Sequence, residues 1–294
     1  TGINIVPKGK GKYVGLTLND NHRFLLGDFT VTHNCLNVRD RPATTIAANK
    51  VICSLIQALG VKHDVDYRLE ENFKKLNYGR LVLVADADDD GLHIEGLLLN
   101  FIHSLYPTLM QRDEPFVVSL KTPIARVIKQ PTGRGAKRIS NDVLFYDERR
   151  FTQWVRTTSG KHNIKYYKGL GTTKPEDVPD TFGEKMVEFI LDENSFANMQ
   201  KAFHSKYSDL RKEWLAEYKP GKESFSLDDV GKSVQMSLTD FVNEELIKFS
   251  HSDCARSIPN GIDGLKESQR KILYAVKKRK LKYSGKSLKV AQLA

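Results

Sequence analysis

The chain has 294 residues, of which 40% are hydrophobic and 28% charged, and 46 lysines and arginines against 36 acids give a formal net charge of +10. This composition is typical of a globular protein and excludes a fibrous or wholly disordered chain. The length suggests about two domains. No apolar run approaches the roughly 20 residues that span a bilayer, so we expect no membrane segment. Three cysteines exclude a disulfide framework and favour an intracellular location. Because the chain begins at Thr1 and stops within a helical pattern, we expect a piece of a longer protein.

Two textures follow one another along the chain. The first 34 residues alternate like short strands separated by turns, whereas strands and helices alternate beyond Cys35, which predicts an α/β domain with crossover helices. The stretch 174–236 is mixed and charged, and we expect a linker with some helix. The predicted strands are 81–85, 116–120, 124–128, 143–146 and 164–167, and the predicted helices are 43–59, one from Gly91 to Leu109, 147–157, 238–249 and 269–278.

Positive charge is concentrated at the C-terminal end. Residues 265–294 contain ten lysines and arginines and a single acid, Glu267. Such a concentration indicates a polyanion partner such as nucleic acid. The alternative is a lysine-rich helix surface that is merely solvated.

Four aspartates, Asp86, Asp88, Asp89 and Asp90, directly follow an apolar strand. Ligand sites in α/β sheets lie at the carboxyl ends of strands, and crowded carboxylates favour Mg²⁺ or Ca²⁺. One alternative is an EF-hand loop, but its twelfth position would be Leu97, where a glutamate is required. Another is that the aspartates cap the following helix, which explains one of them well but not four.

Several motifs together resemble a known family. Four stretches resemble the metal-binding TOPRIM domain of type IIA DNA topoisomerases. They are LNVRD (Leu36–Asp40), Tyr78–His103, TPIARV (Thr122–Val127) and YYKGLGT (Tyr166–Thr172). Two further stretches, RKEWL (Arg211–Leu215) and Ser237–Ala275, resemble the segment that leads into the DNA breakage-and-rejoining domain of that family. Because both parts share one chain, the resemblance points to the single-chain topoisomerase II of eukaryotes and large DNA viruses.

The resemblance implies a domain organisation. We expect a Rossmann-like parallel sheet of the TOPRIM type over residues 35–173 and a linker or helical extension over 174–236. A mostly α-helical winged-helix segment, the truncated start of the breakage-and-rejoining domain, is expected over 237–294.

The resemblance also implies an activity. An ATP-dependent type II topoisomerase passes one duplex through a transient, Mg²⁺-dependent double-strand break in which a tyrosine is joined to the DNA. By position in the motifs, Asp86, Asp88 and Asp90 are expected to hold Mg²⁺, with two ions possible. The residues expected near DNA are Lys168, Gly169, Gly171, Arg270 and Lys271. A homodimer is implied, as are ATP use by a domain absent from this chain and a location in the nucleus or at a viral replication site.

The chain departs from the family pattern in several places. It has no Glu-Gly-Asp-Ser motif upstream of Leu36, no tyrosine in the context of the nucleophile and no ATPase domain, so we expect the isolated fragment not to cleave DNA. Leu92, Glu95 and Glu267-Ser268 also differ from the residues usual there. Two alternative functions are a TOPRIM nuclease or primase-like enzyme, which has no reason to carry DGLKESQRK, and a DNA-binding module without catalysis.

The segment before Leu36 resembles something else, the C-terminal end of an intein. The match runs from Val14 to Cys35. Asn34 can cyclise onto its own carbonyl and cut the backbone, His33 can protonate the leaving amine, and the thiol of Cys35 can accept the upstream segment. His22 matches an assisting histidine of many inteins. This predicts an all-β intein remnant over residues 1–34, with protein splicing as a further function.

Overall fold

The computed structural model describes residues 36–128, 142–160, 162–167, 169–175, 177–221, 225–282 and 284–285. The predicted intein segment, with His22, His33, Asn34 and Cys35, lies outside these residues, and so does Lys168.

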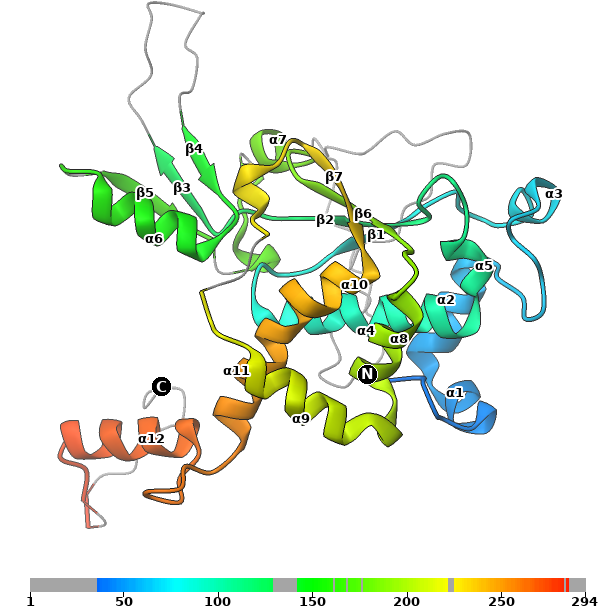
Figure 1. The fold of residues 1–294 in the computed structure, drawn as a ribbon. Helices are drawn as coiled ribbons and strands as arrows, with labels where there is room; N and C mark the ends of the chain where they lie inside the picture. Colours follow the sequence, from blue (N-terminus) through cyan, green and yellow to red (C-terminus); the bar gives the residue numbers. More distant parts are fainter. Residues whose placement is uncertain are drawn as a thin grey trace, which may run out of the picture.

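A four-stranded sheet forms the centre of the described part of the chain (Figure 1). Its strand order is β1 (Leu81–Val84), β2 (Val117–Leu120), β6 (Met186–Ile190) and β7 (Ser233–Ser237). The pairs β1–β2 and β6–β7 are parallel, but β2 and β6 are antiparallel. The sheet is therefore mixed, not parallel throughout as the sequence suggested.

The last two strands come from the stretch that we expected to be linker and helix. In β6, Val187 and Phe189 are buried on one face while the residues between them are partly exposed. This alternation is typical of a half-buried strand, but it extends over only five residues in a highly charged stretch. So short an alternation is a weak signal for a strand, and it does not specify β2 as the pairing partner.

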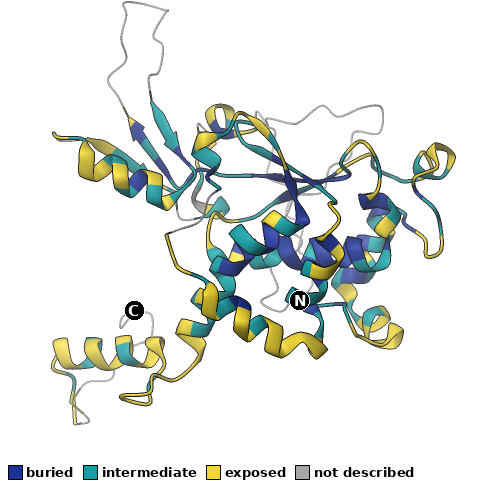
Figure 2. Cartoon of the chain, in the orientation of Figure 1, coloured by how far each residue is buried: buried dark blue, intermediate teal, exposed yellow. Residues whose placement is uncertain are grey.

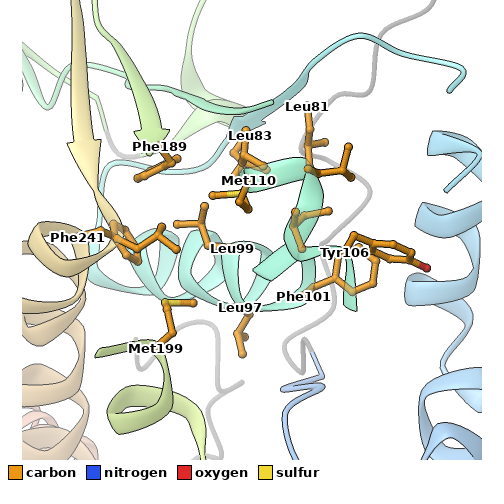
Figure 3. Packing of buried hydrophobic residues seen from close by; sticks show 14 of the residues in the cluster. Leu81, Leu83, Leu97, Leu99, Phe101, Tyr106, Met110, Phe189, Met199 and Phe241 are labelled. Atoms are coloured by element: carbon orange, nitrogen blue, oxygen red, sulfur yellow. The ribbon is translucent and has the colours of Figure 1, made fainter. Parts of the chain in front are cut away.

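One long helix covers the centre of the sheet. Helix α4 (Asp89–Leu105) and the short α5 (Pro107–Met110) connect β1 to β2. Leu99, Phe101 and Ile102 of α4 are fully buried and lie in the core beside strand residues such as Leu83 and Phe189 (Figure 3). The predicted helix from Gly91 to Leu109 thus contains a break at Tyr106, just before the proline of α5.

Helices from both halves of the chain pack around α4. A hypothetical Cβ on Gly96 would lie 3.1–3.4 Å from Leu246, Phe203 and Phe241, so glycine permits a close crossing there. The elements concerned are α8 (Ser195–Phe203), α10 (Leu238–Asp240), the π-helical η5 (Phe241–Leu246) and α11 (Ile247–Ser257). The predicted helix 238–249 therefore continues eight residues further and includes a π-helical segment.

Asn49 divides the predicted helix 43–59 into α1 (Ala43–Ala48) and α2 (Lys50–Leu59). Its backbone is extended, and its side chain accepts a hydrogen bond from the Ile52 amide at 3.0 Å, which caps α2. The remaining short elements are α3 (Glu70–Phe73), η2 (Leu170–Thr172), α7 (Val178–Thr181), η3 (Ser205–Tyr207), α9 (Ser208–Glu217) and η4 (Leu227–Asp229).

A second, smaller sheet has its own core. Strands β3 (Ala125–Ile128), β4 (Val143–Phe145) and β5 (Asn163–Tyr166) are antiparallel in the order β4-β3-β5, and α6 (Glu148–Thr157) packs on them. We expected these strands to belong to the α/β layer. They form a separate sheet instead, in which β3 pairs with β4 on one side and with β5 on the other, and α6 connects β4 to β5.

The C-terminal helix α12 (Glu267–Lys278) extends away from the central sheet and is largely exposed (Figures 1 and 2). Within the described residues its main packing partner is α11. The winged-helix arrangement predicted for this region stays a prediction.

Candidate functional site

The four aspartates lie where β1 ends and α4 begins. Asp88 is the N-cap of α4, and its Oδ1 accepts a hydrogen bond from the Gly91 amide at 2.8 Å. The capping interpretation is therefore correct for Asp88. A Cβ on Gly91 would lie 2.1 Å from the carbonyl oxygen of Asp86, so this tight strand-to-helix turn requires glycine.

The Gly169–Leu170 backbone approaches the first of these aspartates. The Leu170 amide donates to Oδ1 of Asp86 at 2.7 Å, although the two residues are 84 positions apart. A Cβ on Gly169 would lie 2.8 Å from Oδ2 of Asp86, whereas one on Gly171 would have no atom within 4 Å. The structure thus brings together two of the predicted site residues, Asp86 and Gly169.

Asp90 has a different environment. Both of its carboxylate oxygens accept from the Arg256 guanidinium, at 3.1 Å for Oδ2, so α4 is joined to the end of α11. Among the residues that the structure describes, no three histidine, cysteine, aspartate or glutamate side chains are placed to share a metal ion. A metal role for Asp90 would require release of Arg256 and stays a prediction.

The donor chemistry of Asp86 and Asp88 nevertheless fits Mg²⁺. This ion is commonly held by one or two carboxylates, with waters and substrate phosphates completing its coordination. Within the described residues, each of the two side chains accepts its hydrogen bond at Oδ1, so Oδ2 can serve as a hard oxygen donor. An EF-hand is excluded because a strand precedes the cluster and Leu97 is buried in the core.

A buried ion pair that was not predicted from the sequence lies next to the cluster. Glu95, 2% exposed, accepts a hydrogen bond from the Ser119 hydroxyl at 2.6 Å and pairs with Lys121 just beyond β2. Glu95 follows Asp88 by seven residues, two helical turns, so the spacing predicts that both occupy one face of α4. Lys121 had no such signal, since its partner is 26 positions away.

These groups line a cavity of about 650 Å³. Its lining includes Asp86, Asp88 and Asp89 with Glu95 and Lys121, together with residues of α6, η5 and α11. Among the residues that the structure describes, three lysines or arginines line the cavity, and each pairs with a carboxylate: Lys121 with Glu95, Arg149 with Asp147 and Lys248 with Glu245. The acids outnumber these cations, so the cavity favours a cationic ligand.

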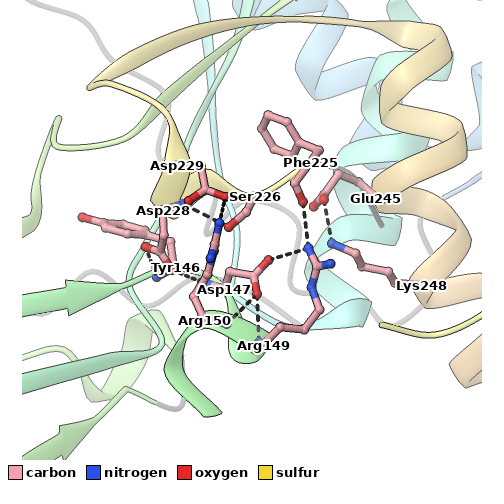
Figure 4. Close-up of polar contacts among 10 residues, drawn as sticks. All are labelled: Tyr146, Asp147, Arg149, Arg150, Phe225, Ser226, Asp228, Asp229, Glu245 and Lys248. Carbon is pink, nitrogen blue, oxygen red and sulfur yellow. Dashed lines mark hydrogen bonds and ion pairs between the residues drawn. The ribbon is translucent and has the colours of Figure 1, made fainter. Parts of the chain in front are cut away.

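Other lining residues, Tyr146, Asp147 and Arg149, belong to a hydrogen-bonded network (Figure 4). Asp228 accepts from the amides of Tyr146 and Asp147, each at 3.0 Å, and Asp147 caps α6. Arg149 donates to the Phe225 carbonyl at 2.9 Å. Burial raises the pKa of Asp228, while the two amide hydrogen bonds oppose this rise. The network fixes the small sheet and α6 against the 225–229 segment and so shapes the cavity.

The predicted DNA contacts on α12 are not near the aspartates. Arg270 pairs with Asp263 through two hydrogen bonds of 2.8 Å, and Lys271 pairs with Glu267. The Arg270 hydrogen bonds lower the pKa of Asp263 to about 2, so this pair is fully charged at neutral pH. Both cations are exposed, and Figure 1 shows α12 apart from the end of β1.

Successive parts of the chain match family models of topoisomerases. The family model described as the C-terminal associated domain of TOPRIM matches residues 120–254, and a DNA gyrase/topoisomerase IV model matches residues 256–294. The structure also resembles the crystal structure of the Plasmodium falciparum topoisomerase II DNA-binding, cleavage and re-ligation domain. The TM-score is 0.67 at 34% identity, over 88% of this chain and 33% of that one. The chain corresponds to the TOPRIM and breakage-rejoining region of type II DNA topoisomerases.

Full-length relatives agree with this assignment. DNA topoisomerase 2 of Invertebrate iridescent virus 6 is 44% identical over 266 residues, which are 88% of this chain and 23% of that protein. DNA topoisomerase 2 of Saccharomyces cerevisiae is 38% identical over 275 residues, 91% of this chain and 18% of that protein. The chain therefore spans less than a quarter of these topoisomerases. In the part of it that the structure describes, no helix combines the length and apolarity needed to cross a membrane.

Proposed function

We propose that this chain is the metal-binding and DNA-contacting part of an ATP-dependent type II DNA topoisomerase. Such an enzyme passes one duplex through a transient double-strand break in another. The observation that carries the proposal is the pair Asp86 and Asp88 at the end of β1, opening on an acidic cavity in a chain that matches topoisomerases over 88–91% of its length. A TOPRIM nuclease or primase is not favoured, because the match continues through residues 256–294.

In this proposal, Asp86 and Asp88 hold Mg²⁺ at the broken phosphate. The ion supplies charge stabilisation for the phosphate and for the leaving sugar oxygen. Asp88 is fixed by its capping hydrogen bond, and Asp86 by the Leu170 amide. The nucleophilic tyrosine, a further carboxylate and the ATPase domain are expected from parts of the protein outside this sequence. The DNA duplex would extend from the cavity toward the basic α12. We expect the whole protein to act as a homodimer, in the nucleus or at a viral replication site.

The decisive experiment is ATP- and Mg²⁺-dependent relaxation of supercoiled plasmid by the intact protein. Asp86→Asn should reduce relaxation roughly 100-fold or more, because it removes charge from the group that holds the ion. Asp113→Asn, which changes an exposed carboxylate beyond α5, is the matched control and should relax DNA normally. Unchanged relaxation by Asp86→Asn would show that the metal site has been assigned to the wrong residue.

We also propose that residues 1–34 are the C-terminal end of an intein. In the reaction, the side-chain amide nitrogen of Asn34 attacks its own carbonyl carbon, and the bond to the Cys35 nitrogen breaks. A succinimide forms, and His33 protonates the released amine. Support comes from the motif and from the fold resuming close to the junction, since Asn37 donates to the Phe203 carbonyl at 2.8 Å.

Mass spectrometry of the purified chain tests this second proposal. Incubation at neutral pH should release residues 1–34, ending in the succinimide, and leave a product that begins at Cys35. Asn34→Ala should stay intact under the same conditions, because it lacks the attacking amide. A chain that remains whole, or an Asn34→Ala variant that is cut at the same bond, contradicts the proposal.

A further inference from the structure

The carboxylate of Asp86 rests on the backbone of residues 169 and 170. The Leu170 amide donates to Oδ1 at 2.7 Å, and Oδ2 lies 2.8 Å from the position that a Cβ on Gly169 would take. The backbone at Gly169 is extended, so the reason for glycine there is space and not backbone conformation. At Gly171 nothing lies within 4 Å of the corresponding position, so only the first glycine of this loop faces the carboxylate.

The chain from β5 through Gly169 and Leu170 to Asp177, called the loop below, is fixed at its start. The Tyr167 amide donates to the Ile124 carbonyl at 3.0 Å, which extends the pairing of β5 with β3. This contact fixes the chain three residues before Leu170, independently of the aspartate.

The far end of the loop is fixed by a buried carboxylate. Asp177, 4% exposed, pairs with Lys165 and lies 3.5 Å from the Arg126 guanidinium. Burial by itself raises the pKa of Asp177, but the hydrogen bond from Lys165 and the charges of Lys165 and Arg126 outweigh burial, and the net pKa is lowered. The Asp177 carboxylate is therefore charged at neutral pH. Arg126 also pairs with Asp180 of α7 at 2.7 Å. Both ends of the loop are therefore bound to the small sheet.

We propose that Gly169 and the Leu170 amide are positioning residues for the Asp86 carboxylate. This inference rests on the proposed metal site and adds a role for the loop besides the DNA contact expected from the sequence. A carboxylate on a short side chain after a strand can rotate, and one fixed hydrogen bond to Oδ1 selects the orientation in which Oδ2 can bind a cation. Such supporting contacts to a metal ligand commonly change metal affinity about 10- to 100-fold.

The first test asks whether the contact exists in solution. The chain has five Gly–Leu steps, so carbonyl-¹³C glycine and ¹⁵N leucine labelling gives five resolved amide correlations in an HNCO spectrum. Asp86→Ala should move the Leu170 correlation, although the two residues are distant in sequence. Asp89→Ala, a neighbouring aspartate on the first turn of α4, should leave it in place. A Leu170 correlation that ignores Asp86→Ala overturns the inference.

The second test measures Mn²⁺ binding by electron paramagnetic resonance, with Asp86→Ala defining the binding that belongs to this site. Gly169→Ala should weaken that binding about 10- to 100-fold. Gly171→Ala should bind like the unsubstituted chain, because its methyl group enters open space. Equal affinities in Gly169→Ala and the unsubstituted chain overturn the positioning role, and so does an equal loss in both glycine variants. If the unsubstituted chain shows no Asp86-dependent binding, the metal site itself fails, and the positioning role fails with it.

Discussion

The buried pair of Glu95 and Lys121 offers the sharpest test of the energetics beside the cavity. The two side chains are 3% and 13% exposed. Lys121→Met leaves the Glu95 carboxylate in the protein interior without its cation. Breaking a buried pair in this way typically costs about 3–5 kcal/mol. Glu95 keeps the Ser119 hydroxyl as a donor, a hydrogen bond worth about 1 kcal/mol, so we expect the lower end, about 3 kcal/mol.

The assay is urea denaturation followed by circular dichroism. The free energy of unfolding is compared between variants that share the same dependence on urea concentration. Lys212→Met is the matched control, since it breaks a pair with Asp209 whose side chains are 77% and 85% exposed. It should cost less than about 1 kcal/mol. The double variant Glu95→Leu/Lys121→Met should recover most of the loss, because it removes both buried charges. A Lys121→Met variant that costs no more than the control would refute the buried pair, and so would a double variant that loses the sum of its single changes.

Two further predictions concern α4. Gly91→Ala should destabilise the chain by about 1–3 kcal/mol despite the better helix propensity of alanine, because its Cβ would meet the backbone oxygen of Asp86 at 2.1 Å. Gly96→Ala should cost less, since it meets only the ends of side chains, and equal thermal stabilities would contradict the tight turn at Gly91. Burial, together with the Arg39 charge, lowers the pKa of His103 to about 4. The unfolded chain therefore binds the extra proton first, and stability should fall by up to about 3 kcal/mol as the pH drops from 6.5 to 4. His103→Gln should flatten this part of a stability-versus-pH curve, and an unchanged slope would show that His103 titrates normally.

The local elements were predictable where short-range chemistry decides them. The apolar run 81–85 became β1, and Asp147 became the N-cap of a helix beginning one residue later. The aspartate cluster at the end of β1 also followed from the strand pattern, because side chains beyond a buried strand lie at the edge of the sheet. The family resemblance came from motifs that are contiguous in sequence, and the comparisons confirm it for the TOPRIM and breakage-rejoining region.

Contacts between distant segments were not predictable, and they determine the topology and the environment of each aspartate. The antiparallel pairing of β6 with β2 makes the central sheet mixed, although nothing within 186–190 specifies its partner. Arg256 reaches Asp90 across 166 positions, and Leu170 reaches Asp86 across 84. The sequence by itself determined which residue types gather after β1, because local hydrophobicity and turn chemistry act over a few residues. Only the tertiary structure decided which carboxylate is fixed by an amide, which caps a helix and which pairs with an arginine, because those partners arrive through packing of the whole fold.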